Sequence, residues 1–177
     1  MKRNLIYCLV LLVSISSCTK PSPEEFTLKH GTNISHWLSQ SDRRGEERLN
    51  FFTEKDMDLI AEVGYDHIRL PIDEEQLWDE SGAKIEEAFT LLHNAIEWAM
   101  ERDLKVVVDL HIIRSHHFNE GDRPLWTDPA EQDKFIDLWR DLSSELKQYP
   151  VSDVAYELMN EAVTDDPDNW NNLIART

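Results

Sequence analysis

Polar residues that could do acid–base chemistry stand in or at the end of several short apolar runs. Asn160 and Glu161 close the run that begins at Val154, and Arg69 and His111 lie in two earlier runs of the same kind. A carboxyl group beside an amide, with a guanidinium and an imidazole nearby, can hold a polar substrate and transfer a proton. Such a site requires these runs to be neighbours in the fold.

Four β-like runs alternate with four helical patterns after residue 25. We expect strands at 26–35, 67–72, 105–111 and 154–161, and helices at 53–63, 85–102, 128–149 and from residue 166. Strict alternation predicts a parallel sheet with right-handed crossovers. An open doubly wound sheet would carry a glycine-rich phosphate loop after an early strand, and the sequence has none. Polar residues at successive strand ends are typical of a (β/α)8 barrel.

The predicted fold class is therefore α/β, a (β/α)8 TIM barrel of which this chain holds only the first four β/α units. A barrel of this type takes about 250 residues. We expect residues 26–177 to be the N-terminal half of such a barrel domain. A small, complete α/β domain of four units is the alternative.

Glu161 is the best candidate for a proton donor. Hydrolysis of a glycoside with retention uses two carboxyl groups about 5–5.5 Å apart, one of which protonates the leaving oxygen. Glu161 ends an apolar strand, so it would stand partly desolvated at the mouth of a barrel and could act as acid/base. Asp109 and Glu157 lie deeper in their strands than a substrate could reach. No residue of the chain is therefore a convincing nucleophile.

The aromatic and histidine residues allow further interpretations. Tryptophans in loops could stack on sugar rings and those on helices should pack in the core; the loop set is Trp37, Trp78 and Trp126, the helix set Trp98, Trp139 and Trp170. Trp37 is the preferred stacking residue, and His116 and His117 are expected in a loop near the substrate. The same histidines with His111 and Asp109 could instead bind zinc, but no second strand end is rich in histidine. We expect no metal and no cofactor.

The N-terminus is typical of an export signal. Lys2 and Arg3 precede a short apolar run, which small residues follow up to Cys18. Ile15–Cys18 resembles the lipobox of bacterial lipoproteins, which implies that residues 1–17 are a lipoprotein signal peptide and that Cys18 carries lipid. An ordinary signal with an incidental cysteine is the alternative. Residues 18–25 are expected to be a tether, and Cys8 would leave with the signal, so no disulfide is possible.

The expected location follows from that signal and from the charge. The protein would be exported and lipid-anchored to the bacterial cell envelope through Cys18, with the absence of aspartate after the cysteine favouring the outer membrane. The chain has 18 Lys and Arg against 35 Asp and Glu, a formal charge of −17. So acidic a surface argues against nucleic acid as a partner. It suits an enzyme that acts on a neutral polymer.

Four motifs resemble a known family. Val154–Glu161, with the sequence VAYELMNE, is similar to the active-site signature of glycoside hydrolase family 5, the cellulase family. The segments that resemble its first three strands occur in family order; they are Gly31–Ser35 with Trp37 behind it, Gly64–Pro71 and Val106–His111. The family usually has proline or valine after the acid/base, where this chain has Ala162.

This resemblance implies a role for each site residue. Glu161 would be the acid/base, Asn160 would bind the sugar 2-hydroxyl, and His111 would hydrogen-bond the sugar. Arg69 would keep the nucleophile ionised, although a salt bridge to Glu157 inside the barrel is a simpler interpretation, and both can hold. The family's nucleophile is a glutamate at the end of strand seven, which would be encoded beyond Thr177, so that this chain alone would be inactive.

The resemblance therefore implies a retaining hydrolase of β-linked polysaccharide or oligosaccharide, similar to an endo-β-1,4-glucanase. Two other classes stay open. One is a surface glycan-binding lipoprotein that kept the barrel and lost the chemistry, and the other is a zinc hydrolase.

Overall fold

A computed structural model describes residues 26–177. The expected signal peptide, the lipid on Cys18 and the tether lie outside these residues. Within residues 26–177, no helix combines the length and apolar character needed to cross a membrane.

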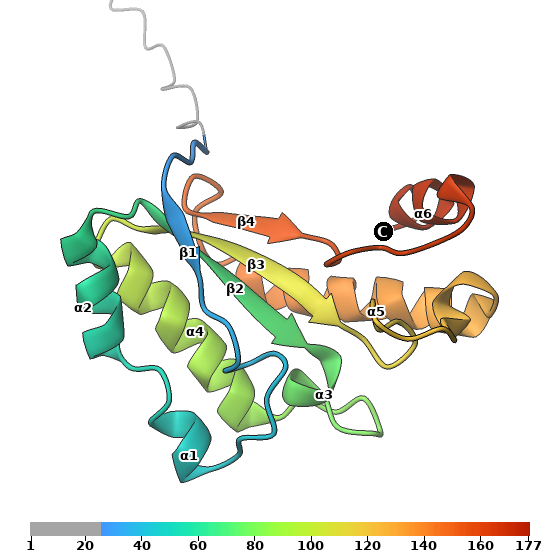
Figure 1. The fold of residues 1–177 in the computed structure, drawn as a ribbon, viewed down its shortest axis with the longest axis horizontal. Coiled ribbons are helices and arrows are strands. Elements are labelled where there is room, and N and C mark those ends of the chain that lie inside the picture. Colours follow the sequence, from blue (N-terminus) through green and yellow to red (C-terminus); the bar gives the residue numbers. More distant parts are fainter. Residues whose placement is uncertain (1–25) are drawn as a thin grey trace, which may run out of the picture.

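The sheet has four parallel strands whose order follows the sequence. These strands are β1 (Gly31–Asn33), β2 (His67–Asp73), β3 (Lys105–Ile112) and β4 (Val154–Glu157). A doubly wound sheet reverses its strand order at a switch point, whereas here each strand pairs with the next (Figure 1). Sequential parallel pairing is that of one wall of a (β/α) barrel, so the predicted fold class is confirmed.

A helix follows each strand, and the helices after the first three strands cover one face of the sheet, whereas the last helix lies beyond the C-terminal end of β4 (Figure 1). The main ones are α2 (Glu54–Val63), α4 (Glu86–Met100), α5 (Pro129–Leu146) and α6 (Pro167–Ile174). All four were expected from apolar periodicity. Shorter turns occur inside the connecting loops, where the sequence has no helical period; they are α1 (Glu46–Leu49), α3 (Glu74–Leu77) and the 3-10 helix η1 (Pro124–Trp126).

Three of the main helices, α2, α5 and α6, begin at the capping residues expected from the sequence, whereas α5 ends at Leu146, three residues before the expected Tyr149. The backbone N–H of Thr53 donates to Asp56 at 2.8 Å at the start of α2, which satisfies one of the free donors of a helix N-terminus. Asp128 accepts from the N–H of Ala130 at 2.9 Å at the start of α5. Gly64 ends α2 with φ of 93°, a left-handed conformation that glycine adopts without steric cost.

The core lies between the sheet and these helices. Alternate residues of β2 and β3 point into it and are fully buried, namely Ile68, Leu70, Ile72, Val106, Val108 and Leu110. Each helix contributes a stripe of buried residues to the same core, including Ala95 and Ile96 of α4 and Phe135 and Leu142 of α5. Because side chains alternate along a strand, His67, Arg69 and Asp109 are left on the opposite face.

Two strands are shorter than expected. β1 was predicted over 26–35 and covers only Gly31–Asn33, and β4 was predicted to reach Glu161 and ends at Glu157. The chain leaves the sheet after Glu157, and Glu161, four residues further on, adopts a left-handed conformation with φ of 43°. In β2, which runs from His67 to Asp73, Arg69 lies in the body of the strand rather than at its end.

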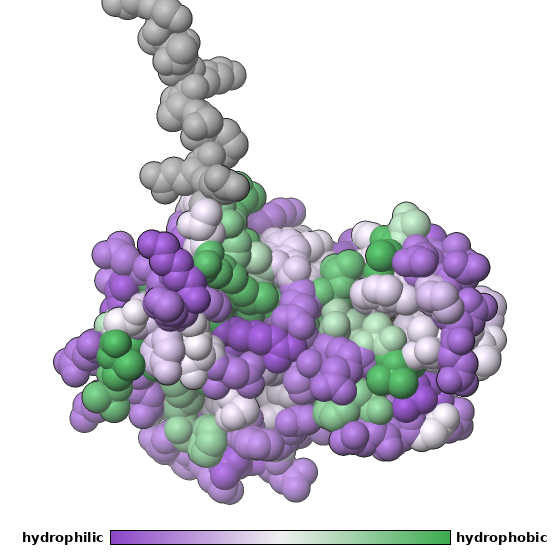
Figure 2. Space-filling model, turned by 45° about the horizontal axis from the view of Figure 1, so that its top comes forward, coloured by the Kyte–Doolittle hydropathy of each residue, from purple (hydrophilic) through white to green (hydrophobic). Residues whose placement is uncertain are grey.

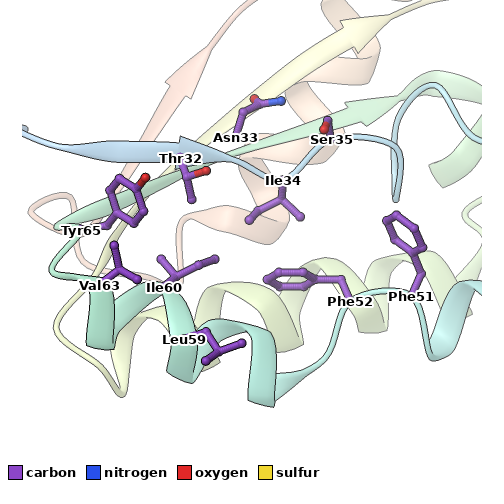
Figure 3. A pocket seen from close by; sticks show the side chains of 10 residues that line it. All are labelled: Thr32, Asn33, Ile34, Ser35, Phe51, Phe52, Leu59, Ile60, Val63 and Tyr65. Atoms are coloured by element: carbon purple, nitrogen blue, oxygen red, sulfur yellow. The ribbon is translucent and has the colours of Figure 1, made fainter.

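Both outer edges of the sheet expose apolar side chains. Beside β1, Leu59 and Val63 of α2 are 59% and 73% exposed, and beside β4, Val151 and Tyr156 are 78% and 41% exposed. A cavity between β1 and α2 is lined mainly by apolar residues, with Phe52, Ile60 and Val63 among them (Figure 3). Hydrophobic patches also interrupt a mostly hydrophilic surface (Figure 2). In a closed barrel, neighbouring β/α units cover such edges.

Candidate active site

Arg69 is the centre of a cluster on the sheet face away from the helices. Its Nε and Nη2 donate to the two carboxylate oxygens of Glu157, each at 2.7 Å. Its Nη2 also lies 2.8 Å from Oδ2 of Asp109, which is fully buried. A two-pronged guanidinium–carboxylate contact fixes both side chains in one geometry. The expected salt bridge between Arg69 and Glu157 is therefore present.

Two asparagines, one in β1 and one after β4, also accept hydrogen bonds from Arg69. Its Nη1 donates to Oδ1 of Asn33 at 3.1 Å, and its Nη2 donates to Oδ1 of Asn160 at 3.0 Å. Arg69 is paired in register with Val107, whereas Asp109 is paired with Glu157. The guanidinium thus reaches diagonally toward the C-terminal ends of β3 and β4, as strand stagger in a barrel requires.

His111 joins the cluster through Asp109. Its Nδ1 lies 2.7 Å from Oδ2 of Asp109, the same oxygen that contacts Arg69. The imidazole is also in edge contact with the ring of Phe118, with centroids 5.7 Å apart. A carboxylate at Nδ1 favours the tautomer with its proton there and leaves Nε2 as the acceptor.

Neighbouring charges and burial have opposite effects on the pKa values of the residues in this cluster. The hydrogen bond to Glu157 raises the pKa of Arg69, with further contributions from the charges of Asp109 and Glu161, while burial opposes the rise. Burial raises the pKa of Asp109, although His111 and Arg69 act against that rise. Oδ1 of Asp109 is buried without a hydrogen-bond partner among residues 26–177.

Glu161 lies beside the cluster but is exposed. Asn160, directly before it, is 9% exposed, and the charge of Glu161 is close enough to act on Arg69. The side chain is exposed among residues 26–177, and its partial desolvation at the mouth of a closed barrel stays a prediction. The described residues form a single wall, so the side chain faces the open side of the sheet.

Trp37 and His116 are not placed as substrate-binding residues, which corrects two predictions. Trp37 is fully buried, packs against Phe52 and donates from Nε1 to the carbonyl of Arg48 at 2.9 Å. No face of its ring is free to stack on a sugar, because the chain after β1 turns inward. His116 is 1% exposed and packs edge-on to Trp126. Burial lowers its pKa.

The remaining tryptophans divide differently from the loop and helix sets. Trp78 was a stacking candidate but is 1% exposed, with Nε1 donating to Asp141 at 2.9 Å. Trp126 is half-buried and donates to the carbonyl of Val163 at 2.8 Å. Trp139 was expected in the core and is there, 3% exposed.

The histidines in and after β3 are not gathered as zinc ligands would be. His111 pairs with Asp109, His116 turns inward, and His117 stacks on Phe118 with centroids 4.9 Å apart. Residues 26–177 contain no group of three or more His, Cys, Asp or Glu side chains placed to hold a metal ion.

Two buried acids at the end of β2 were missed from the sequence. Oδ2 of Asp73 accepts from the N–H of Gln40 at 2.6 Å, which ties down the loop after β1. Glu74 accepts from Nη1 of Arg114 at 2.6 Å and contacts Nζ of Lys134 at 2.9 Å, which ties down the loop after β3. Burial raises the pKa of Asp73. It also acts to raise the pKa of Glu74, but hydrogen bonds from Arg114 and Lys134 outweigh it, and the net pKa is lowered.

The sequence around Asp73 and Glu74 gives only a weak indication that these acids are buried. Two consecutive acids directly after an apolar run are as typical of a solvated loop as of a buried ion pair. The basic partners of Glu74 lie 40 or more residues away in the sequence.

Relatives match most of this chain. The model of the family "Cellulase (glycosyl hydrolase family 5)" matches residues 29–177. Endoglucanase C of Acetivibrio thermocellus is 34% identical over 154 residues, which cover 84% of this chain and 44% of that protein. Cellodextrinase A of Ruminococcus flavefaciens is 32% identical over 81% of this chain and 43% of that protein. The chain thus spans less than half the length of these curated relatives.

Solved structures agree with these matches. Cel5A of Thermotoga maritima, determined in complex with cellobiose, superposes with a TM-score of 0.66 at 26% identity, covering 84% of this chain and 46% of that one. A glycoside hydrolase crystal structure gives 0.68 at 21% identity, which speaks for the fold alone. The family match extends over nearly all the described residues, including every residue of the Arg69 cluster. The chain belongs to glycosyl hydrolase family 5, the cellulase family.

Proposed function

We propose that this protein is a retaining glycoside hydrolase that cleaves β-linked polysaccharide, with Glu161 as its acid/base. The observation that carries the proposal is the placement of Glu161 next to Asn160, which is hydrogen-bonded to Arg69 in the centre of the cluster. The family membership and relatives named endoglucanase and cellodextrinase support a β-glucan as the substrate. A β-1,4-glucan is the substrate class we favour.

The reaction would proceed in two displacements. Glu161 first gives its proton to the glycosidic oxygen as a second carboxylate attacks the anomeric carbon, which forms a glycosyl-enzyme and releases the shortened chain. Glu161, now ionised, then takes a proton from water as that water attacks the same carbon. The second step restores both carboxyl groups and gives a product with the original anomeric configuration.

The second carboxylate is proposed to come from a segment outside residues 26–177. Asp109 and Glu157 are the acids nearest the centre of the cluster, and both are held by Arg69 at 2.7–2.8 Å. Both carboxylate oxygens of Glu157 already accept hydrogen bonds from Arg69, and Asp109 is fully buried, so neither is placed to attack a sugar. A glutamate from the opposite wall of a closed barrel would face Glu161 across the substrate.

The neighbours of Glu161 would bind the sugar at the reacting centre. Oδ1 of Asn160 accepts from Arg69, so its amide N–H groups are turned away from the guanidinium and can donate to the sugar 2-hydroxyl. The contact of His111 with Asp109 leaves Nε2 for another sugar hydroxyl. Arg69 would stabilise the ionised nucleophile through its positive charge. No cofactor takes part in this scheme.

The export signal leads to a proposal on location. Residues 1–17 would be removed and Cys18 would carry lipid, with residues 18–25 holding the catalytic domain close to the cell envelope, on the outer membrane. The residue pattern from Lys2 to Cys18 supports this. In cells, Cys18→Ala should move the protein from the membrane fraction to the soluble fraction. An unchanged distribution would rule out anchoring through Cys18.

Turnover of a soluble β-1,4-glucan by the full-length protein tests the catalytic proposal. Glu161→Gln keeps the shape of the side chain but cannot donate a carboxylic proton, so turnover should fall by about 10²–10⁴-fold. Glu62→Gln, the same change on an exposed residue of α2, should have no effect. Near-normal turnover by Glu161→Gln would remove the assignment, and glucan binding without any turnover by the natural protein would indicate a binding protein.

A further inference from the structure

The backbone around Glu161 is unusual because it is held outside the sheet. β4 ends at Glu157, yet Asn160 stays buried and its N–H donates to the carbonyl of Leu110 at 3.3 Å. Glu161 then takes a left-handed conformation, and the N–H of Val163 donates back to the carbonyl of Glu161 at 2.7 Å. A residue with a side chain persists in that conformation only where the surroundings hold it.

Two indole groups hold the backbone on either side of this turn. Nε1 of Trp139 donates to the carbonyl of Leu158 at 2.8 Å, before Asn160 and Glu161. Nε1 of Trp126 donates to the carbonyl of Val163 at 2.8 Å, after them. These carbonyls have left the strand ladder, so the indole hydrogen bonds replace the bonds that a neighbouring strand would supply.

Trp126 is itself fixed by the loop after β3. It ends η1, whose middle residue Leu125 is fully buried and donates from its N–H to the carbonyl of Ser115 at 3.1 Å. The indole meets the ring of His116 edge-on at 5.4 Å and that of Trp170 at 6.4 Å between centroids. Trp126 therefore connects the loops that follow β3 and β4.

We infer that Trp126 is a positioning residue for Glu161, because its indole N–H fixes the Val163 carbonyl and with it the turn that aims the Glu161 carboxyl group. The inference rests on the proposed role of Glu161 as acid/base. It differs from the sequence-based expectation that Trp126 stacks on a sugar, since its hydrogen-bonding group is directed at the protein backbone. Loss of that N–H should misplace the proton donor while the rest of the cluster stays intact.

The test compares aryl β-glycosides of the same sugar with different leaving groups, using the full-length protein. A phenyl glycoside needs protonation as the bond breaks, whereas a 2,4-dinitrophenyl glycoside does not, so the ratio of their kcat/KM values reports acid assistance. Trp126→Phe should lower kcat/KM for the phenyl substrate by about 10–100-fold, as misplacing a catalytic group does. The dinitrophenyl substrate should lose no more than about threefold.

Two further variants separate positioning from folding. Trp78→Phe also removes a buried indole hydrogen bond, to Asp141, but should leave the ratio of the two substrates unchanged. If Trp126→Phe does not fold, 3-benzothienylalanine at position 126 removes only the N–H and keeps the shape of the ring, and the same selective loss is expected. Adding Trp126→Phe to Glu161→Gln should cause no further selective loss.

The outcomes are distinct. An equal loss on both substrates, or no loss, with either change at position 126 overturns the inference while the proposed function stands, provided that Glu161→Gln shows the selective loss. If Glu161→Gln shows no such loss, the proposed function fails as well.

Discussion

Arg69 is the residue on which the geometry of the cluster depends. It makes contact with side chains from β1, β3 and β4 and with Asn160 beyond the last strand. Its carboxylate partners differ in exposure, since Asp109 is fully buried and Glu157 is partly open to water. Removing the guanidinium would therefore leave the buried Asp109 without the positive charge of Arg69 and without access to solvent.

We predict that Arg69→Met destabilises the full-length protein by about 3 kcal/mol, the low end of what breaking a buried ion pair costs, because Glu157 keeps access to water. The measurement is the free energy of unfolding in urea. Arg102→Met is the control, since Arg102 also pairs with acids, namely Glu54, Asp58 and Glu101, but all three are more than half exposed. Equal losses in the two variants would show that the Arg69 contacts are no stronger than surface pairs.

At the scale of elements, β1 and β2 are packed unusually closely. The ring of His67 lies over Gly31, where a β-carbon would overlap it. His67 is held there by Asp66, whose Oδ1 lies 2.7 Å from Nδ1 of the imidazole. Glycine is thus required at the start of β1 for close approach of the neighbouring strand.

Gly31→Ala should lower the free energy of unfolding by about 1–3 kcal/mol, as overpacking does. In a His67→Ala background the added methyl group has room, so the same change should cost much less there. The four free energies, measured in denaturant, form a double-mutant cycle. A cost that is independent of the residue at position 67 would contradict the proposed overlap.

The elements were largely predictable from the sequence, and their loops were not. Periodicity and capping residues predicted α2, α4, α5 and α6, because an apolar stripe and a terminal hydrogen bond are local properties. The side-chain alternation that separates Ile68 from Arg69 was predictable for the same reason. The burial of Trp37 and His116 could not be foreseen, because it depends on how a loop folds back onto elements distant in sequence.

The residues of the Arg69 cluster and one of its contacts were predictable from the sequence, but the course of the backbone after β4 was not. Arg69, His111, Asn160 and the salt bridge to Glu157 were expected, since each lies in or after a strand of a parallel sheet. The bend that ends β4 before Asn160 was not, because VAYELMNE has the apolar character of a continuous strand. Nothing local in that run signals a left-handed Glu161, which depends on partners in other elements.

For the whole molecule, the open edges indicate where further structure would pack. Exposed apolar side chains belong to α2, beside β1, and to β4, and β1 and β4 are the two outer strands of the sheet. The solved relative from Thermotoga maritima is more than twice as long as the part that this chain covers. We expect the remaining units of the barrel to cover both edges.

Leu59 offers a test of that expectation because it is 59% exposed on α2. If another helix covers it in the full-length protein, Leu59→Ser should lower the free energy of unfolding by about 1.5 kcal/mol or more. Glu62→Ser, on the same helix, should have little effect. A change of less than about 0.5 kcal/mol for Leu59→Ser would indicate that this edge stays in solvent.

The most direct measurement of the central claim is the product that Glu161→Ala forms in the presence of azide. The variant can still be glycosylated by a 2,4-dinitrophenyl β-glycoside, because that leaving group needs no proton, and azide can then attack without a general base. The account predicts faster turnover with azide and a β-glycosyl azide, identified by the anomeric proton in its NMR spectrum. An α-glycosyl azide, or turnover that azide leaves unchanged, would contradict a retaining mechanism with Glu161 as acid/base.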